Sequence, residues 1–325
     1  MFQEKYLNIL RSNHMCRIVL LSFLLTIHSA LLSQNWEKLC KEGNFIKFKE
    51  IVTKNPDKIN NKNKKDGCTV LHYASSYGYS NFIELLLMNG AKIDLVDFDG
   101  WTPLFYATNF KQDSAIFRLL NNGADVNHRD KEGTTILMFA ALDGKDDYVK
   151  MFVSKGAQIN YQDNAGYTAL MYSIKKNHIS TSKLLIEFGA DVKLKETRYN
   201  QTVLMMLSFL GEQSLMPLIL DKGGLINEIS YEEYSPLMYA SGKGFYSIVE
   251  FLLSKGANIN LVNSEGIDAL MVAVFFNQLE IVKLLLDKGA DINRKNNVGK
   301  TPLKFATDAK NIEIANYLIS KGAEF

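Results

Sequence analysis

Cysteine and histidine are scarce in this sequence, and both shortages narrow the chemistry that it can perform. The chain has 325 residues but only three cysteines, Cys16, Cys40 and Cys68, which are too few for a disulfide framework and are not spaced as metal ligands. The five histidines are also scattered along the chain, without the spacing of a metal site. We therefore expect no metal ion and no cofactor.

The sequence also lacks an excess of one charge. Lysine and arginine total 37, aspartate and glutamate total 35, and the two signs are interspersed, which gives a formal net charge of +2. A nucleic-acid-binding surface normally needs a dense basic face, so we do not expect nucleic acid as the partner. No P-loop, dinucleotide-binding fingerprint or serine nucleophile motif is present. We therefore predict a protein that is not an enzyme and has no catalytic residues.

One apolar run, residues 18–32, stands apart near the N-terminus, just after Arg17. Its length fits the hydrophobic region of a signal peptide and is short for a membrane-spanning helix. Translation could begin at Met1 or at Met15, and the second start would leave a compact signal peptide. We predict that residues 1–35 are a signal peptide and that the protein is exported, to the periplasm or outside the cell. The alternative is an uncleaved anchor that tethers the protein to a membrane through residues 18–32.

From about residue 36 onward the sequence repeats with a period of 33 residues. Gly100 marks a turn, Thr102 suits the N-cap of a short helix, and Gly123 suits the end of a second helix. The turn position recurs every 33 residues except for one step of 34, from Gly166 to Asn200, and the helix-end position slips at the same place. Helices this short are marginal alone in water, so we predict that neighbouring copies stack on one another.

Two motifs in each copy identify a family resemblance. Residues 102–107 read TPLFYA, and residues 123–127 read GADVN at the end of the second helix. Segments similar to TPLFYA begin at Thr69, Thr135, Thr168, Thr202, Ser235, Asp268 and Thr301. These segments resemble the TPLHxA and GAD(V/I)N motifs of the ankyrin repeat family. The resemblance implies an all-α fold, a solenoid of stacked helix-turn-helix units with hairpin fingers projecting from one edge.

We divide the chain accordingly into three parts. Residues 1–35 are the signal peptide or anchor, residues 36–66 a degenerate capping repeat, and residues 67–325 eight repeats of about 33 residues. The last repeat carries extra polar residues and is predicted to be a C-terminal cap.

Departures from the family pattern lead to further predictions. The histidine of the motif is kept only at His72; methionine replaces it in most other copies, and the helical register predicts that these methionines are buried. One aspartate per finger, as at Asp97 and Asp163, is assigned to turn formation. The fifth repeat has its extra residue in a loop, and Pro217 predicts that its second helix starts late and packs loosely.

Aromatic residues occupy first-helix and finger positions, from which the binding face of this family is usually built. Rigid aromatic side chains are common anchors of protein interfaces, although each could instead pack between repeats. Trp101 is the leading candidate because the repeat does not require it. The partner-binding candidates are Trp101, Tyr77, Phe98, Phe110, Tyr167, Phe209, Tyr231, Tyr234, Phe275 and Phe276. We predict a monomeric scaffold that binds another protein outside the cytoplasm; the alternatives are a membrane-tethered array or an accessory subunit that modulates an enzyme.

Overall fold

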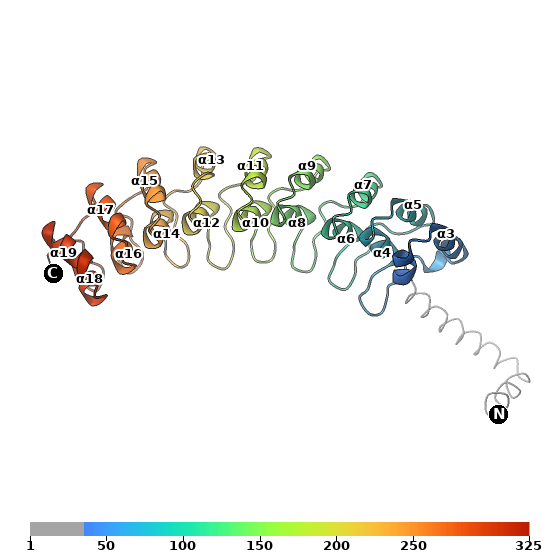
Figure 1. Ribbon diagram of the computed structural model, residues 1–325, viewed down its shortest axis with the longest axis horizontal. Helices are drawn as coiled ribbons and strands as arrows, with labels where there is room; N and C mark the ends of the chain where they lie inside the picture. Colours follow the sequence, from blue (N-terminus) through green and yellow to red (C-terminus); the bar gives the residue numbers. More distant parts are fainter. Residues whose placement is uncertain (1–35, 325) are drawn as a thin grey trace, which may run out of the picture. The chain divides into compact units, whose positions relative to one another are not determined.

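The computed structural model describes residues 36–324, which form helices and turns with no strand (Figure 1). The all-α prediction is therefore confirmed for this part of the chain. The chain divides into two compact units, with the boundary between Lys131 and Glu132. The predicted signal peptide or anchor, residues 1–35, lies outside the described residues. Within residues 36–324, no helix is long and apolar enough to cross a membrane.

The first unit contains three helix pairs among its described residues. A helix at residues 36–42 precedes α3 (Phe45–Lys54) and the short 3-10 helix η1 (Pro56–Lys58). Two further pairs follow, α4 (Val70–Ser76) with α5 (Ser80–Met88) and α6 (Pro103–Asn109) with α7 (Asp113–Asn121). First helices pack on first helices, α4 against α6, and second helices pack on second helices, α3 against α5 and α5 against α7.

The second unit contains six helix pairs in the same order. They are α8 (Ile136–Leu142) with α9 (Asp146–Ser154), α10 (Ala169–Lys175) with α11 (Ile179–Glu187), α12 (Val203–Leu210) with α13 (Met216–Asp221), α14 (Pro236–Lys243) with α15 (Tyr246–Ser254), α16 (Ala269–Phe275) with α17 (Leu279–Asp287), and α18 (Pro302–Asp308) with α19 (Ile312–Ser320). Within this unit, Figure 1 shows the first helices in one row, the second helices in another and the fingers projecting beyond the first helices. The two rows pack together within each repeat.

Capping side chains explain why the first helices begin where they do. Thr102 Oγ1 accepts a hydrogen bond from the backbone N–H of Phe105, and Pro103 occupies the first position of α6, where its missing N–H is not needed. The same cap is provided in the second unit by Thr135, Thr168, Thr202, Ser235, Asp268 and Thr301. At the other end of the pair, Gly123 has a φ of +85°, a left-handed conformation that favours glycine.

The methionines that replace the family's histidine are core residues, as predicted. Each has a relative exposure of 1% or less; they are Met138, Met171, Met205, Met238 and Met271. His72 is also fully buried, and Thr69 donates its backbone N–H to His72 Nδ1 at 3.0 Å. Because Nδ1 accepts that bond, Nε2 carries the proton and donates to the carbonyl oxygen of Trp101 at 3.0 Å.

Aspartates at the bases of the fingers hold the turns, which confirms the role assigned to Asp97 and Asp163. Asp97 Oδ1 accepts hydrogen bonds from the backbone N–H groups of Asp99 and Trp101 at 2.9 and 2.8 Å. Asp97 Oδ2 accepts a third from the hydroxyl of Tyr106 at 2.7 Å. Asp163 makes the equivalent three contacts in its own finger.

The fifth repeat accommodates its extra residue inside the finger, so the predicted loop position is confirmed. Glu196 stands where the other fingers carry aspartate or a similar short side chain, and it is buried. Its carboxylate accepts from the backbone N–H groups of Arg198, Tyr199 and Gln201 at 2.8, 2.9 and 3.0 Å. The additional methylene of glutamate thus spans the additional residue of the turn.

The second helix of the fifth repeat starts late, as Pro217 predicts. Helix α13 begins at Met216 and has six residues, whereas the other second helices of the unit have nine. Close contacts link α9 with α11, α15 with α17 and α17 with α19, whereas the main neighbour of α13 is α12 of its own repeat. The layer of second helices is therefore least tightly connected at the fifth repeat.

Candidate protein-binding pocket

The ten aromatic candidates differ in how far the structure exposes them. Six are exposed: Phe98, Phe110, Phe209, Tyr231, Phe275 and Phe276. Four are only partly exposed: Tyr77, Trp101, Tyr167 and Tyr234. Exposure alone does not select among them, so the surroundings of each decide what it can do.

Trp101 is packed among neighbouring side chains in the first unit. Its ring centroid lies 5.9 Å from that of Phe105 and 5.8 Å from that of Tyr106, and its indole N–H donates to Asp130 Oδ2 at 3.2 Å. Trp101, Phe105 and Tyr106 are called the Trp101 cluster below. The cluster joins a finger to its first helix, so part of the surface of Trp101 serves the fold and only the remainder is open to a partner.

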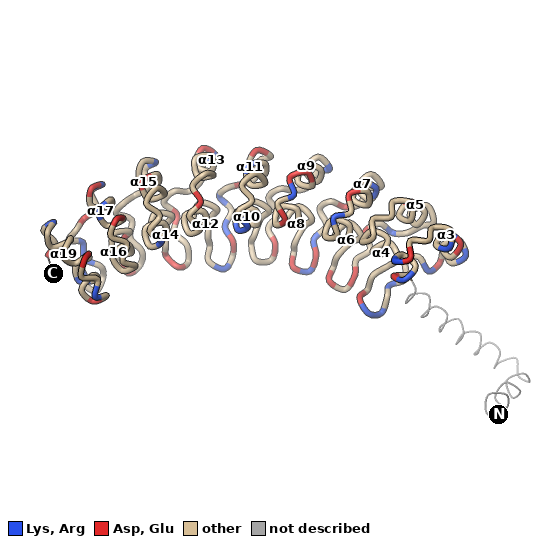
Figure 2. Tube along the Cα trace, in the orientation of Figure 1, with Lys and Arg blue, Asp and Glu red and all other residues tan. Residues whose placement is uncertain are grey.

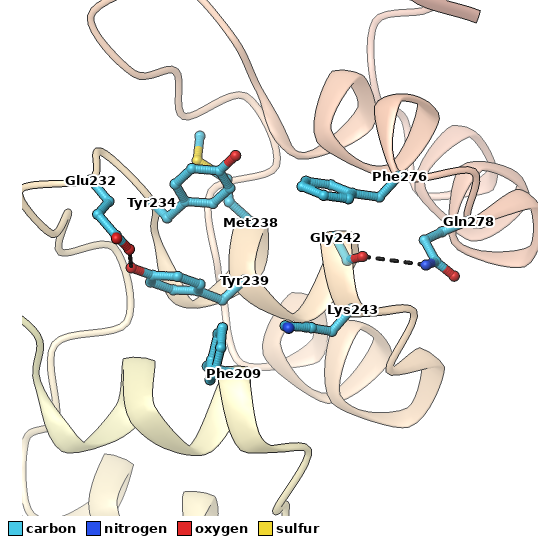
Figure 3. Close-up of a pocket in the computed structure, with 9 residues that line it drawn as sticks. All are labelled: Phe209, Glu232, Tyr234, Met238, Tyr239, Gly242, Lys243, Phe276 and Gln278. Carbon is cyan, nitrogen blue, oxygen red and sulfur yellow. Dashed lines mark hydrogen bonds between the residues drawn. The ribbon is translucent and has the colours of Figure 1, made fainter. Parts of the chain in front are cut away.

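In the second unit, by contrast, aromatic residues line an open pocket of about 570 Å³ (Figure 3). The aromatic pocket is formed by Phe209, Glu232, Tyr234, Met238, Tyr239, Gly242, Lys243, Phe276 and Gln278. These residues come from the end of α12, from α14, from the segment between α16 and α17, and from the finger that precedes α14. Its volume is of the size that holds a large side chain or a short peptide segment.

A glycine in a helix opens the pocket. Gly242 lies in the last turn of α14, at the position that carries Asn109 in the second repeat and Phe209 and Phe275 in the adjoining repeats. A Cβ at Gly242 would lie 3.1 Å from both Phe276 Cδ2 and Val272 Cγ1. Glycine inside a helix costs about 1 kcal/mol relative to alanine, and here it lets the ring of Phe276 approach the backbone of α14.

Aromatic contacts define the wall around Tyr239. Its ring centroid is 5.9 Å from that of Phe209 at an interplanar angle of 90°, and 5.2 Å from that of Tyr234. The Tyr239 hydroxyl donates to Glu232 Oε2 at 3.0 Å and accepts from Gln201 Nε2 at 2.8 Å. Phe209 and Phe276 remain 45% and 48% exposed, so each presents ring surface that the fold does not use.

Charged groups sit at the rim of this wall. Lys243 Nζ lies 4.2 Å from the ring centroid of Phe209, a cation–π contact.

Burial and the Glu232 carboxylate raise the pKa of Tyr239 to about 12. Burial also raises the pKa of Tyr234, with further contributions from the carboxylates of Glu232 and Glu265. Both phenols are therefore neutral at physiological pH and available as hydrogen-bonding groups.

A comparison with protein families identifies the scaffold that carries this pocket. A profile for ankyrin repeats, described as three copies of the repeat, matches residues 38–130, 107–196, 189–263 and 237–325. The chain belongs to the ankyrin repeat family. A search of curated proteins found no match. Ankyrin repeats generally mediate protein–protein interaction and are typically non-enzymatic.

The ankyrin array brings together three of the ten predicted site residues, Phe209, Tyr234 and Phe276, in the aromatic pocket. Tyr167 instead packs on Tyr172 at 5.4 Å and under Lys175, while Tyr231 and Phe275 lie outside the residues that line the pocket. The other four, Tyr77, Phe98, Trp101 and Phe110, belong to the first unit.

Sequence reasoning missed the polar and small members of the pocket. Glu232, Gly242, Lys243 and Gln278 were not among the predicted candidates, and Tyr239 was assigned only to the repeat motif. Aligning the repeats could have revealed Gly242, because a helical position that has a side chain in every other copy loses it there. Within residues 36–324, no three His, Cys, Asp or Glu side chains gather as metal ligands.

Proposed function

We propose that this ankyrin array is a scaffold that binds another protein and that the aromatic pocket holds a side chain of that partner. The observation that best supports the proposal is the pair of rings, Phe209 and Phe276, that stand nearly half exposed on either side of Gly242. Glycine inside a helix lowers stability, and such departures from local propensity are expected at functional sites. Basic and acidic residues alternate along the described chain of each unit, which favours a protein over nucleic acid as the partner (Figure 2).

The proposal is tested by comparing capture of partners by three forms of the array. The wild type, a Phe209→Ala/Phe276→Ala variant and a control are each used as bait in a lysate of the source organism, with mass spectrometry as the readout. The control, Phe188→Ala/Tyr246→Ala, removes two other exposed aromatic rings of the same unit, at 38% and 47% exposure, outside the pocket. We expect to find a protein that the wild type and the control capture in similar amounts and that the pocket variant captures about tenfold less. Equal capture by all three forms at unchanged melting temperatures would contradict a binding role for the pocket.

We also propose that the array acts outside the cytoplasm. The support is the apolar run at residues 18–32, which follows Arg17 and has the length of a signal-peptide core. Sequencing the N-terminus of the protein purified from its source checks this: a new N-terminus shortly after residue 32, in an exported fraction, is the expected result. Recovery of Met1 or Met15 in a membrane fraction would favour the tethered alternative.

A further inference from the structure

The aromatic pocket has a carboxylate at one end and a lysine toward the other (Figure 3). Glu232 is exposed, and its carboxylate accepts one hydrogen bond, from the Tyr239 hydroxyl. Glu265, on the next finger, is also exposed, and its charge acts on the phenol of Tyr234. Among residues 36–324, no basic group lies within 4 Å of either carboxylate. The finger end of the pocket thus has the carboxylate of Glu232 in its lining and that of Glu265 beyond the lining residues, neither with a basic partner among the described residues.

A difference at the base of the finger explains why Tyr239 bonds to the carboxylate of Glu232. In the second repeat, Asp97 is buried and accepts from the Tyr106 hydroxyl. The residue at the same repeat position before α14 is Ser230, whose Oγ is 3.1 Å from the Tyr239 hydroxyl. Tyr239 then reaches outward to Glu232, two residues further along the finger. The interior carboxylate is absent from this finger, and the tyrosine hydroxyl bonds instead to Glu232, at the repeat position that carries Asp99 in the second repeat.

The rings of the pocket already hold a cation. Lys243 Nζ lies over the face of Phe209, while the rings of Tyr234 and Phe276 line the pocket without a cation against them among the described residues. Aromatic faces attract cations, and the attraction is stronger where water is excluded. An incoming group that combines a flat apolar surface with positive charge would therefore match both the rings and the carboxylates.

Building on the proposed binding function, we infer that the aromatic pocket takes an arginine side chain from an exposed segment of the partner protein. Its guanidinium stacks on the ring faces of Tyr234 and Phe276 and faces the carboxylates of Glu232 and Glu265. Guanidinium is planar, weakly hydrated and able to form two parallel hydrogen bonds with a carboxylate. Lysine has the charge but not the flat surface, and an acidic side chain would be repelled by both carboxylates.

The inference is tested by selecting a phage-displayed library of random 12-residue peptides on the purified full chain. Selected peptides are then synthesised, and their affinities are measured by fluorescence polarisation against the wild type and against Glu232→Gln/Glu265→Gln. The matched control is Glu187→Gln/Glu250→Gln, which makes the same change in net charge on α11 and α15, away from the pocket. Glutamine at position 232 can still accept the Tyr239 hydrogen bond, so the variant keeps that contact.

We expect arginine to be enriched among the selected peptides and its replacement by glutamine to weaken binding about tenfold or more. The same loss is expected in Glu232→Gln/Glu265→Gln with the original peptide, little loss in the control, and equal or tighter binding to Lys243→Gln. Enrichment of acidic residues that depends on Lys243, or of apolar residues indifferent to both carboxylates, would overturn the arginine assignment and leave the pocket as a binding site. Peptides that bind Phe209→Ala/Phe276→Ala as well as the wild type would overturn the proposed function itself.

Discussion

Trp101 and Tyr234 occupy the same position in their repeats, directly after the finger turn, yet their surroundings differ. Trp101 packs on Phe105 and Tyr106 and donates its indole N–H to Asp130. Tyr234 packs on Tyr239 on one side and lines the aromatic pocket on the other. An aromatic residue at this position therefore serves the fold in one repeat and forms an accessible wall in another.

Two further exchanges account for the difference. Asp97, which bonds to Tyr106 of the Trp101 cluster, is replaced by Ser230 in the later finger, where Tyr239 bonds to an exposed glutamate. Asn109 at the end of α6 becomes Gly242 at the end of α14, which leaves open the space that a side chain would fill. An ankyrin repeat thus gains a pocket through the loss of small side-chain groups around a retained aromatic residue. A large aromatic residue at this position is not enough to form a pocket.

The largest expected effect is the loss of stability at low pH around His72, whose side chain bonds to the carbonyl of Trp101. Burial lowers the pKa of His72 to about 4, partly offset by its hydrogen bond to the Trp101 carbonyl and by Asp97. Since this folded-state pKa lies below the ordinary histidine pKa of 6.5, its contribution to stability is complete above pH 6.5 and is lost as pH falls to 4. The loss should reach about 3 kcal/mol. Urea unfolding of the wild type and of His72→Met between pH 7 and 4 measures this loss. The same dependence of unfolding free energy on pH in both proteins would contradict the prediction.

The next largest effect should distinguish Asp97 from Ser230, which occupy the same position in two different fingers. Asp97→Ala removes a buried carboxylate that accepts three hydrogen bonds, and we expect the free energy of unfolding to fall by about 2–3 kcal/mol. Ser230→Ala removes one weaker acceptor and leaves Tyr239 its bond to Glu232, so about 1 kcal/mol is expected. Urea denaturation at neutral pH compares the two variants, and a similar loss of unfolding free energy in both would contradict the prediction.

Filling the pocket should remove binding with little change in stability. Gly242→Asn introduces the residue that the second repeat carries at this place, and its Cβ must displace the ring of Phe276. We expect at least about a tenfold loss of pocket-dependent peptide binding, because the space is occupied, and a change in stability within about 1 kcal/mol, because better helix propensity offsets the close contact. Asn109→Gly in the first unit is the matched control and should leave binding unchanged.

The smallest effect concerns Trp101 itself. Trp101→Phe keeps an aromatic ring against Phe105 and Tyr106 but removes the N–H donated to Asp130, which should cost about 1 kcal/mol of stability. Peptide binding at the aromatic pocket should not change. Thermal melting and fluorescence polarisation on the same samples separate the two effects. A loss of partner binding without a loss of stability would instead support Trp101 as an interface residue in its own right.

Local rules were enough to predict most of the scaffold. Thr102 as a cap, the end of the second helix at Gly123, the loop position of the extra residue and the burial of the methionines all follow from capping, periodicity and helical register. The pocket could be predicted only in part. Phe209, Tyr234 and Phe276 were visible as aromatic residues on an exposed face, but the opening depends on the absent side chain at 242, which no motif records.

The membrane or export role of residues 18–32 stays a prediction, and so does an interface role for the aromatic residues outside the pocket. Tyr167 illustrates why sequence position alone does not decide such cases. It stands where Trp101 and Tyr234 stand, yet its ring lies against Tyr172 and beneath the ammonium of Lys175. Whether a ring at this position is covered depends on the length and charge of its neighbours, which the repeat pattern leaves free to vary.

The finger held by Glu196 has a practical consequence for engineering. One additional residue at positions 197–199 is absorbed within the turn, and α12 still begins at its threonine cap, two residues after the turn glycine position. A single side chain that bonds to three backbone N–H groups therefore isolates the helices from a change in loop length. That finger is the place in the chain where a reporter tag or a foreign recognition loop should be grafted first.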